Sequence, residues 1–302
     1  MTPTPLEAAP PGLADGRHVL LKREDVHELG AFKWRGALPA LEAYCAAGAE
    51  AVVTASTGNH GAATAWAAAR LGMRAVVFAP PGASRTKLDL IRQFGAEARL
   101  AGADFDDAKA TAAEFAEAEG LPYFEDGAER AQYEGYRSIA REILAQSDEE
   151  PAAVVAPLGN GALLGGIGLE LAERSPQTER VGVAAREAPV MVESWLAGEV
   201  VESDRSGTFA DGLAVRVAIP YAVGVLAEVT SRMLLVSERE IARAVATYAG
   251  LGIRAEGAAG AALAALSQLE DVEGPIVLVV TGRNIDDELW QRAVERPESF
   301  PD

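Results

Sequence analysis

The chain has 302 residues, of which 49% are hydrophobic, so it can form one large domain or two ordinary ones around a real core. Its single cysteine, Cys45, excludes an intrachain disulfide and a cysteine-rich zinc site and is typical of a reducing compartment, so we expect a cytoplasmic protein. A formal charge of −18 argues against a nucleic-acid partner, and the sequence shows neither a membrane span nor a signal peptide.

Short β-branched runs alternate along the chain with longer alanine-rich helical stretches, a pattern typical of a parallel sheet covered by helices. The predicted strands cover 18–22, 51–55, 74–79, 97–101, 152–157, 180–185, 232–236 and 275–280. The predicted helices include 60–71, 84–94, 105–119, 130–146, 162–173, 238–250 and 257–268. Most strands are apolar on both faces, so we expect an α/β fold that binds ligands beyond the carboxyl ends of its strands.

The loop STGNHG (56–61) joins a predicted strand to a predicted helix. One hydroxyl is enough to cap a helix, whereas this loop carries four polar side chains in five residues. Two interpretations stay open: a plain helix cap, or a site that holds a carboxylate or phosphate on the free N–H groups of the helix.

A second loop, LGNGALLGGIG (158–168), is rich in glycine and also leads into a helix. The spacing of Gly159, Gly161 and Gly165 is one residue off the dinucleotide-binding fingerprint, and Glu187 follows roughly where a ribose-binding acid would stand. The same glycines could instead hold one phosphate of another cofactor, or form a tight turn with close helix packing. A third polar loop, TGRN (281–284), follows the last predicted strand.

The chain has only four lysines, at positions 22, 33, 87 and 109. Lys33 lies between Phe32 and Trp34, and an amine held among apolar side chains suits nucleophilic or Schiff-base chemistry. Lys22 lies in or at the end of a strand, whereas Lys87 and Lys109 lie on charge-bearing helices where we expect them to be solvated.

Taken together and in order, these segments resemble the pyridoxal-phosphate (PLP) enzymes of the tryptophan synthase β-like fold, and within them the threonine/serine dehydratase and serine racemase group. The resemblance is carried by TPLE (4–7), LLKRED (20–25), GAFKWRGA (30–37), STGNHG (56–61), RTKLDLIRQFGAE (85–97), PLGNGALLGGI (157–167), FADGLAV (209–215), EGAAGAALAAL (256–266) and TGRN (281–284). It implies a two-lobed, open parallel-sheet sandwich. A large PLP-binding domain would comprise 1–41 and 129–302, and a small mobile domain would comprise 42–128.

The resemblance also implies a role for individual residues. Lys33 would form the Schiff base with PLP and act as base on the substrate α-carbon, and Thr57 would be a second catalytic residue. The substrate carboxylate would be held by Ser56, Thr57, Asn59 and His60. The cofactor would be bound by Lys33, by Asn59 at its ring oxygen, by Thr281 at its ring nitrogen, and at its phosphate by Gly159, Asn160, Gly161, Ala162 and Leu163.

The implied function is that of an ammonia-lyase, which converts a β-hydroxy amino acid to a 2-keto acid and ammonia. A hydroxyl at Thr281 would not keep the ring nitrogen protonated, which favours elimination or replacement at the β-carbon. The alternatives within the family are a threonine synthase-like or cysteine synthase-like replacement enzyme, a hydroxyaspartate dehydratase and a serine racemase. Thr57 stands where racemases have a serine, and Asn160 and Ala162 interrupt the glycines of the phosphate loop.

Other expectations concern partners. Ala184 and Val190 stand where some relatives have metal-binding acids, so we predict no metal. Arg137 could be a surface residue or could recognise a carboxylate on the substrate side chain. A small amino acid is the expected partner, and the resemblance implies a homodimer. Outside the family, an NAD-binding dehydrogenase and a catalytically inactive ligand-binding protein remain possible.

Overall fold

The computed structural model describes residues 2–13, 16–203 and 206–302, and it divides the chain into two compact units. The smaller unit is Ala31–Gly135, and the larger one combines Met1–Gly30 with Tyr136–Asp302. The predicted domain limits at 42 and 128, and the mobility of the small domain, stay predictions. Five residues of the predicted large domain, 1, 14, 15, 204 and 205, lie outside the described residues.

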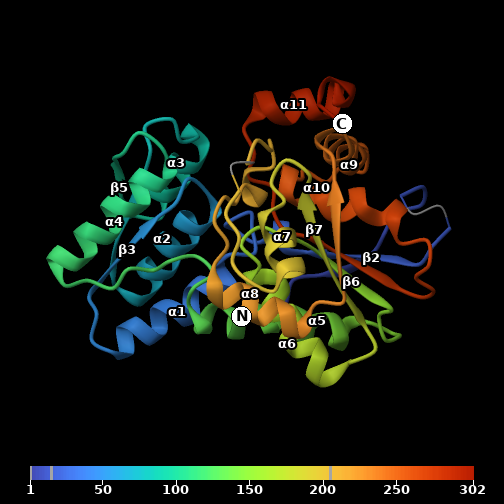
Figure 1. Ribbon diagram of the computed structural model, residues 1–302, viewed down its shortest axis with the longest axis horizontal. Coiled ribbons are helices and arrows are strands. Elements are labelled where there is room, and N and C mark those ends of the chain that lie inside the picture. The colour runs from blue at the N-terminus through green and yellow to red at the C-terminus, as the bar shows by residue number, and fades with distance from the viewer. Residues whose placement is uncertain (1, 14–15, 204–205) are drawn as a thin grey trace. The chain divides into compact units, whose positions relative to one another are not determined.

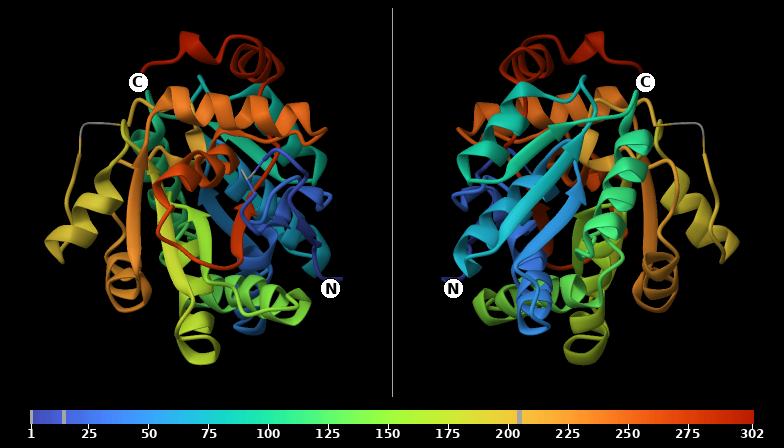
Figure 2. Two further views of the ribbon diagram at one scale, coloured as in Figure 1. Left: turned by 90° about the vertical axis from the view of Figure 1, so that its right-hand side faces the viewer. Right: turned by 90° about the vertical axis from the view of Figure 1, so that its left-hand side faces the viewer.

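The smaller unit is built on a three-stranded parallel sheet in the order β3-β4-β5, drawn in blue to green in Figure 1. Its strands are β3 (Ala51–Ala55), β4 (Arg74–Ala79) and β5 (Glu97–Leu100). Its helices are α1 (Trp34–Ala46), α2 (Asn59–Leu71), α3 (Arg85–Gln93) and α4 (Phe105–Glu119). The right-hand view of Figure 2 shows the three strands side by side.

Helices cover both faces of this small sheet, because all of β3 and nearly all of β4 are buried. Val53 and Phe78 pack against α4 on one face. On the other face α2 lies so close to the sheet that a Cβ at Gly61 would stand 3.0 Å from Cγ1 of Val77. Strand β3 ends at Ala55 and α2 begins at Asn59, so the 56–61 loop lies at the carboxyl edge of the sheet.

The larger unit contains a six-stranded sheet in the order β1-β2-β9-β6-β7-β8, parallel except for β1. The strands are β1 (Leu6–Ala8), β2 (Val19–Arg23), β6 (Ala153–Pro157), β7 (Glu179–Ala185), β8 (Arg232–Val236) and β9 (Ile276–Val280). The left-hand view of Figure 2 shows the yellow-green β7 beside the orange β8.

The α-helices of the larger unit are α6 (Ala162–Arg174), α7 (Val190–Ala197), α8 (Pro220–Val229), α9 (Glu238–Gly250), α10 (Gly257–Ala264) and α11 (Asp287–Glu295). Helix α5 (Arg130–Gln146) contributes its first residues to the smaller unit and the rest to the larger one. Short 3-10 helices span Glu24–Val26, Asp211–Leu213, Ala265–Gln268 and Pro297–Ser299.

The core of the larger unit lies on both faces of its sheet. On one face Val155, Val183 and Leu278 pack with apolar residues of α9 and α10. On the other face α6 comes so close that a Cβ at Gly182 would lie 2.8 Å from Cδ2 of Leu164. The α/β class with parallel sheets is therefore confirmed.

All eight predicted strands are present, with ends that differ by at most one residue. The predicted helix 257–268 is an α-helix only to Ala264 and continues as a 3-10 turn. Strand β1 escaped prediction because it has three residues and lies at a sheet edge. Among the described residues, no helix combines the length and apolar character that crossing a membrane would require.

Candidate active site

The loop between β3 and α2 leaves the start of α2 without a side-chain cap. Gly58 is the N-cap residue, and no side chain at that position bonds to the first turn. Ser56 is 5% exposed, and its hydroxyl accepts a hydrogen bond from N–H of Gly58 (3.1 Å). Elsewhere, Ser84, Asp104 and Ser237 cap α3, α4 and α9 with their side chains. The N–H groups at the start of α2 are thus suited to an anion.

The structure places all four predicted substrate-binding residues in this one loop and the first turn of α2. Thr57 and Asn59 are half-buried, and Asn59 is the first residue of the helix. His60 is different, because its ring is 5% exposed and turned into the smaller unit. Its Nε2 lies 3.0 Å from Oγ1 of Thr54 and 3.3 Å from the carbonyl oxygen of Phe124. The imidazole of His60 therefore contacts Thr54 and Phe124 within the smaller unit.

Lys33 immediately precedes α1 and forms an ion pair inside the smaller unit. Its Nζ lies 2.5 Å from Oδ2 of Asp126, and the side chains of the two residues are 15% and 25% exposed. The flanking Phe32 and Trp34 are buried, and the Nζ stands 5.2 Å from the centre of the Phe32 ring. The amine thus lies beside apolar side chains and one carboxylate.

Asp126 is a residue that the sequence analysis missed. Besides Lys33, it contacts Nδ1 of His60 at 3.4 Å and accepts a hydrogen bond from Nε2 of Gln132 at 3.0 Å, both at Oδ1. Burial acts to raise the pKa of its carboxyl. The charges of Lys33 and His60, with the hydrogen bonds from Lys33 and Gln132, outweigh burial and hold that pKa well below its usual range.

A signal for Asp126 exists in the sequence, although it is short. Tyr123 pairs with Val53 in an isolated parallel bridge, and N–H of Phe124 donates to the carbonyl oxygen of Val53 (2.8 Å). The segment before Asp126 thus runs beside β3 in the same direction. Parallel segments end at the same edge, which brings Asp126 and the loop after β3 together. Two bonded residues are too few for a recognisable strand pattern.

In the larger unit, the predicted phosphate loop occupies the turn between β6 and α6. Gly161 is the N-cap of α6 and has a φ of +90°, a conformation that favours glycine. Oδ1 of Asn160 accepts a hydrogen bond from N–H of Ala162 at 3.2 Å. The next amide, that of Leu163, lies in the first turn of the helix, where the helix supplies no acceptor. This arrangement suits an anion such as a phosphate.

Thr281 directly follows β9 and is 2% exposed. Its hydroxyl oxygen is buried, and among the described residues it has no hydrogen-bond partner. A buried hydroxyl without a partner is unfavourable, so this atom is suited to a ligand that provides one. This observation agrees with the cofactor-binding role predicted for Thr281.

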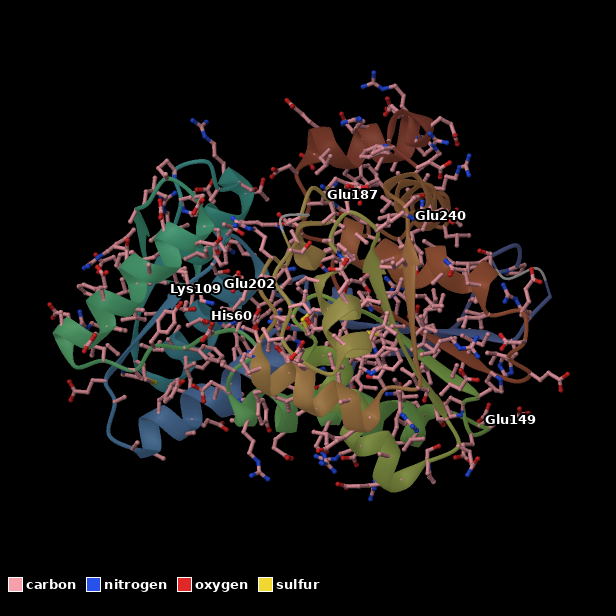
Figure 3. All side chains as sticks on the ribbon, in the orientation of Figure 1. His60, Lys109, Glu149, Glu187, Glu202 and Glu240 are labelled. Atoms are coloured by element: carbon pink, nitrogen blue, oxygen red, sulfur yellow. The ribbon has the colours of Figure 1, made fainter. Side chains whose placement is uncertain are left out.

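The three other lysines differ from one another in burial and in the groups around their amines. Lys22 is fully buried and lies 2.6 Å from Oε2 of Glu142. The expectation that Lys87 is solvated is wrong, because it is only 5% exposed and its Nζ would stand 3.4 Å from a Cβ at Gly58. Lys109, labelled in Figure 3, is 38% exposed and pairs with Glu125.

The sequence left more than one role open for Arg137 and for Glu187. Arg137 pairs with Glu170 (2.7 Å) and with Glu173 on α6, so its guanidinium already has carboxylate partners within the larger unit. Glu187 lies beyond the end of β7, as Figure 3 shows. Among the described residues no group of acidic, histidine or cysteine side chains could hold a metal ion. The absence of a metal stays a prediction.

Comparisons with known proteins give consistent matches. A family model described as pyridoxal-phosphate dependent enzyme matches residues 1–282. The biosynthetic L-threonine dehydratase of Pasteurella multocida is 32% identical over 289 residues, which are 94% of this chain and 56% of that protein. The L-threonine ammonia-lyase of Geobacter sulfurreducens is 33% identical over 285 residues, which are 93% of this chain and 71% of that protein.

A solved structure also matches. The processed form of threonine deaminase isoform 2 from Solanum lycopersicum superposes with a TM-score of 0.91 and is 30% identical. The match covers 97% of this chain and 87% of that one. By contrast, the chain spans little more than half the length of the Pasteurella multocida enzyme.

Proposed function

Since this chain belongs to the family of pyridoxal-phosphate dependent enzymes, we propose that it is an ammonia-lyase acting on a small β-hydroxy amino acid. Threonine and serine are the first candidate substrates, and 3-hydroxyaspartate is the third. The main support is the similarity to an L-threonine ammonia-lyase over 93% of the chain. The products would be ammonia with 2-oxobutanoate from threonine or pyruvate from serine.

Each unit, taken by itself, carries residues that fit a part of PLP. The smaller unit carries the amine of Lys33 beside buried aromatic side chains, a setting that suits an amine that bonds to an aldehyde. The larger unit carries the glycine loop at the start of α6, where the amide of Leu163 has no acceptor within the helix, and, at Thr281, a buried hydroxyl without a partner among the described residues. When bound, PLP supplies the conjugated ring that accepts electrons from the substrate α-carbon.

We propose the following roles for the chain's own side chains. Lys33 holds the cofactor covalently and later takes the proton from the substrate α-carbon. The loop from Ser56 to His60 binds the substrate carboxylate, because no side chain at the N-cap position bonds to the first turn of α2 and a helix N-terminus favours an anion. The amides of 159–163 hold the phosphate, and Asn59 contacts the ring oxygen. Orienting the α-carbon bond toward Lys33 and excluding water are the protein's main contributions.

The neutral hydroxyl of Thr281 favours elimination over transamination. A hydroxyl, unlike a carboxylate, does not keep a ring nitrogen protonated, so a long-lived carbanion is disfavoured. Loss of the β-hydroxyl then gives an enamine, which water converts to the keto acid and ammonia. Thr57 is the second proposed catalytic residue, and its hindered alcohol makes a racemase the weaker alternative.

The test is to incubate the purified, PLP-loaded protein with threonine, serine and 3-hydroxyaspartate and to measure keto acid and ammonia. Equimolar amounts of the two products are expected from at least one substrate, and the Lys33→Ala variant should form neither. Borohydride treatment followed by peptide mapping should place the cofactor on Lys33 and on no other lysine. If keto acid never appears while O-acetylserine or phosphohomoserine is consumed, the chain is a replacement enzyme and the lyase proposal fails.

We also propose a homodimer in a reducing compartment. Cys45, the only cysteine of the chain, is exposed, which is compatible with such a compartment. Sedimentation equilibrium of the loaded protein tests the dimer, and a monomer at micromolar concentration would contradict it.

A further inference from the structure

We infer that His60 is a positioning residue for Lys33, because the carboxylate of Asp126 holds one cation at a time. While the amine of Lys33 is protonated, the carboxylate pairs with the Lys33 ammonium. Once the amine has lost its charge, the carboxylate pairs with the imidazolium of His60. All three residues belong to the smaller unit. The inference rests on the proposed function only where it takes Lys33 as the reacting amine.

The two oxygens of Asp126 face different partners. Oδ2 lies 2.5 Å from Nζ of Lys33, and Oδ1 lies 3.4 Å from Nδ1 of His60. The carboxylate is held in this orientation by Gln132, which is fully buried and donates from Nε2 to Oδ1 (3.0 Å). Oε1 of the same amide accepts from N–H of Gly127 at 2.8 Å, so its orientation is determined as well. The carboxylate therefore touches both bases at once.

The hydrogen bonds of His60 determine which ring nitrogen carries its proton. The hydroxyl of Thr54 donates to the carbonyl oxygen of Phe124 (2.7 Å), so it can only accept from Nε2 of His60 (3.0 Å). Nε2 also faces that same carbonyl oxygen, a pure acceptor, at 3.3 Å. Nε2 therefore carries a hydrogen. In neutral His60 the lone pair lies on Nδ1, directed at Asp126, which makes Nδ1 the site of proton uptake.

Charged groups from two segments of the smaller unit, Lys33 before α1 and the adjacent Glu125 and Asp126, act on this ring. Burial lowers the pKa of His60, the charge of Asp126 opposes that effect, the charge of Lys33 lowers the pKa further, and Glu125 raises it. His60 is thus kept neutral by burial and by the ammonium of Lys33. When that ammonium disappears, the influence of both carboxylates remains and Nδ1 binds a proton more readily.

This exchange breaks one N–H bond and forms another, so the number of protons in the cluster does not change. An amine must give up a proton before it attacks an aldehyde, so an N–H bond breaks at Nζ of Lys33. One N–H bond forms at Nδ1 of His60, and the charge on the Asp126 carboxylate is the same before and after. Because Asp126 is a quarter exposed, solvent can exchange protons with the pair. The cluster keeps its total charge, so the partly buried carboxylate of Asp126 always has a cation beside it.

The test is an NMR titration of the histidine rings, of which the chain has three. In the wild-type protein without cofactor, the His60 ring is expected to titrate below the ordinary histidine pKa of about 6.5. In Lys33→Met, its titration midpoint should move upward. Adding Asp126→Asn to that variant should move the midpoint down again.

The matched control is Arg70→Met, which removes an exposed cation from the other end of α2. Its distance of about 15 Å along the helix exceeds the screening length at physiological salt, so His60 should not respond. An unchanged His60 midpoint in Lys33→Met overturns the inference. If the protein does not load with PLP but His60 still responds in Lys33→Met, the proposed function fails and the charge exchange stands.

Discussion

Nζ of Lys22 lies 2.6 Å from Oε2 of Glu142, and the lysine side chain is fully buried between β2 and α5. The same Nζ donates to the carbonyl oxygen of Thr4 at 2.7 Å. Because the Lys22 side chain is fully buried, its ammonium needs oxygen partners within the protein, and these are two of them. The pair therefore joins the N-terminal segment, the sheet and α5 of the larger unit.

The first prediction concerns this buried pair. Glu142→Ala removes a carboxylate from a fully buried ammonium and should lower the free energy of unfolding by about 3 kcal/mol, measured by urea denaturation. Lys22→Met should cost less, because Glu142 is 16% exposed and water can solvate its charge. The exposed pair of Arg92 and Asp89 is the control, and Asp89→Ala should change stability by less than about 0.5 kcal/mol. Equal effects at positions 142 and 89 would contradict this explanation.

The second prediction concerns Thr281. Thr281→Val keeps the shape but removes the hydroxyl that has no partner, so the cofactor-free protein should be as stable as wild type or more stable by about 1 kcal/mol. With PLP bound the sign should reverse, because the proposed partner of the ring nitrogen is lost and affinity for the cofactor falls. Thr54→Val is the matched control. It breaks a bond to Phe124 and should cost about 1 kcal/mol without cofactor.

The third prediction uses two glycines with positive φ. Gly161→Ala adds a strained backbone conformation and a Cβ 2.6 Å from Cδ1 of Leu226, whereas a Cβ at Gly72 (φ +70°) meets nothing within 4 Å. We expect Gly72→Ala to cost about 1 kcal/mol, from the backbone alone. Gly161→Ala should cost more and should also weaken PLP binding in an equilibrium titration. Unchanged cofactor affinity in Gly161→Ala would argue against the proposed phosphate loop.

The fourth prediction concerns pH. Burial lowers the pKa of His60 below its unfolded value of about 6.5, so the unfolded chain binds a proton at this site more readily than the folded chain does. Stability should therefore fall as pH drops from about 6.5 toward the lower folded pKa of His60. His60→Gln should remove this part of the pH dependence. Urea denaturation of the wild-type protein and of His60→Gln at several pH values measures this difference.

The order of strands and helices was predictable because it depends on local patterns. Continuous apolar runs such as β3 and β9 must be buried on both faces, and alanine-rich stretches between them form the covering helices. The polar loops after those strands were predictable for the same reason, since parallel strands end at one edge of their sheet. The likeness to PLP enzymes rested on the residues in those loops.

The sequence by itself thus determined the fold class, the family and the positions of Lys33, the 56–61 loop, the glycine loop and Thr281. Only the tertiary structure decided which groups these residues meet. Asp126 is 93 positions from Lys33 along the chain. Lys87 is buried, although the charged residues of its helix led us to expect a solvated side chain. Such contacts depend on how separate elements pack, and a pairing of two charges at that separation leaves no periodic pattern in the sequence.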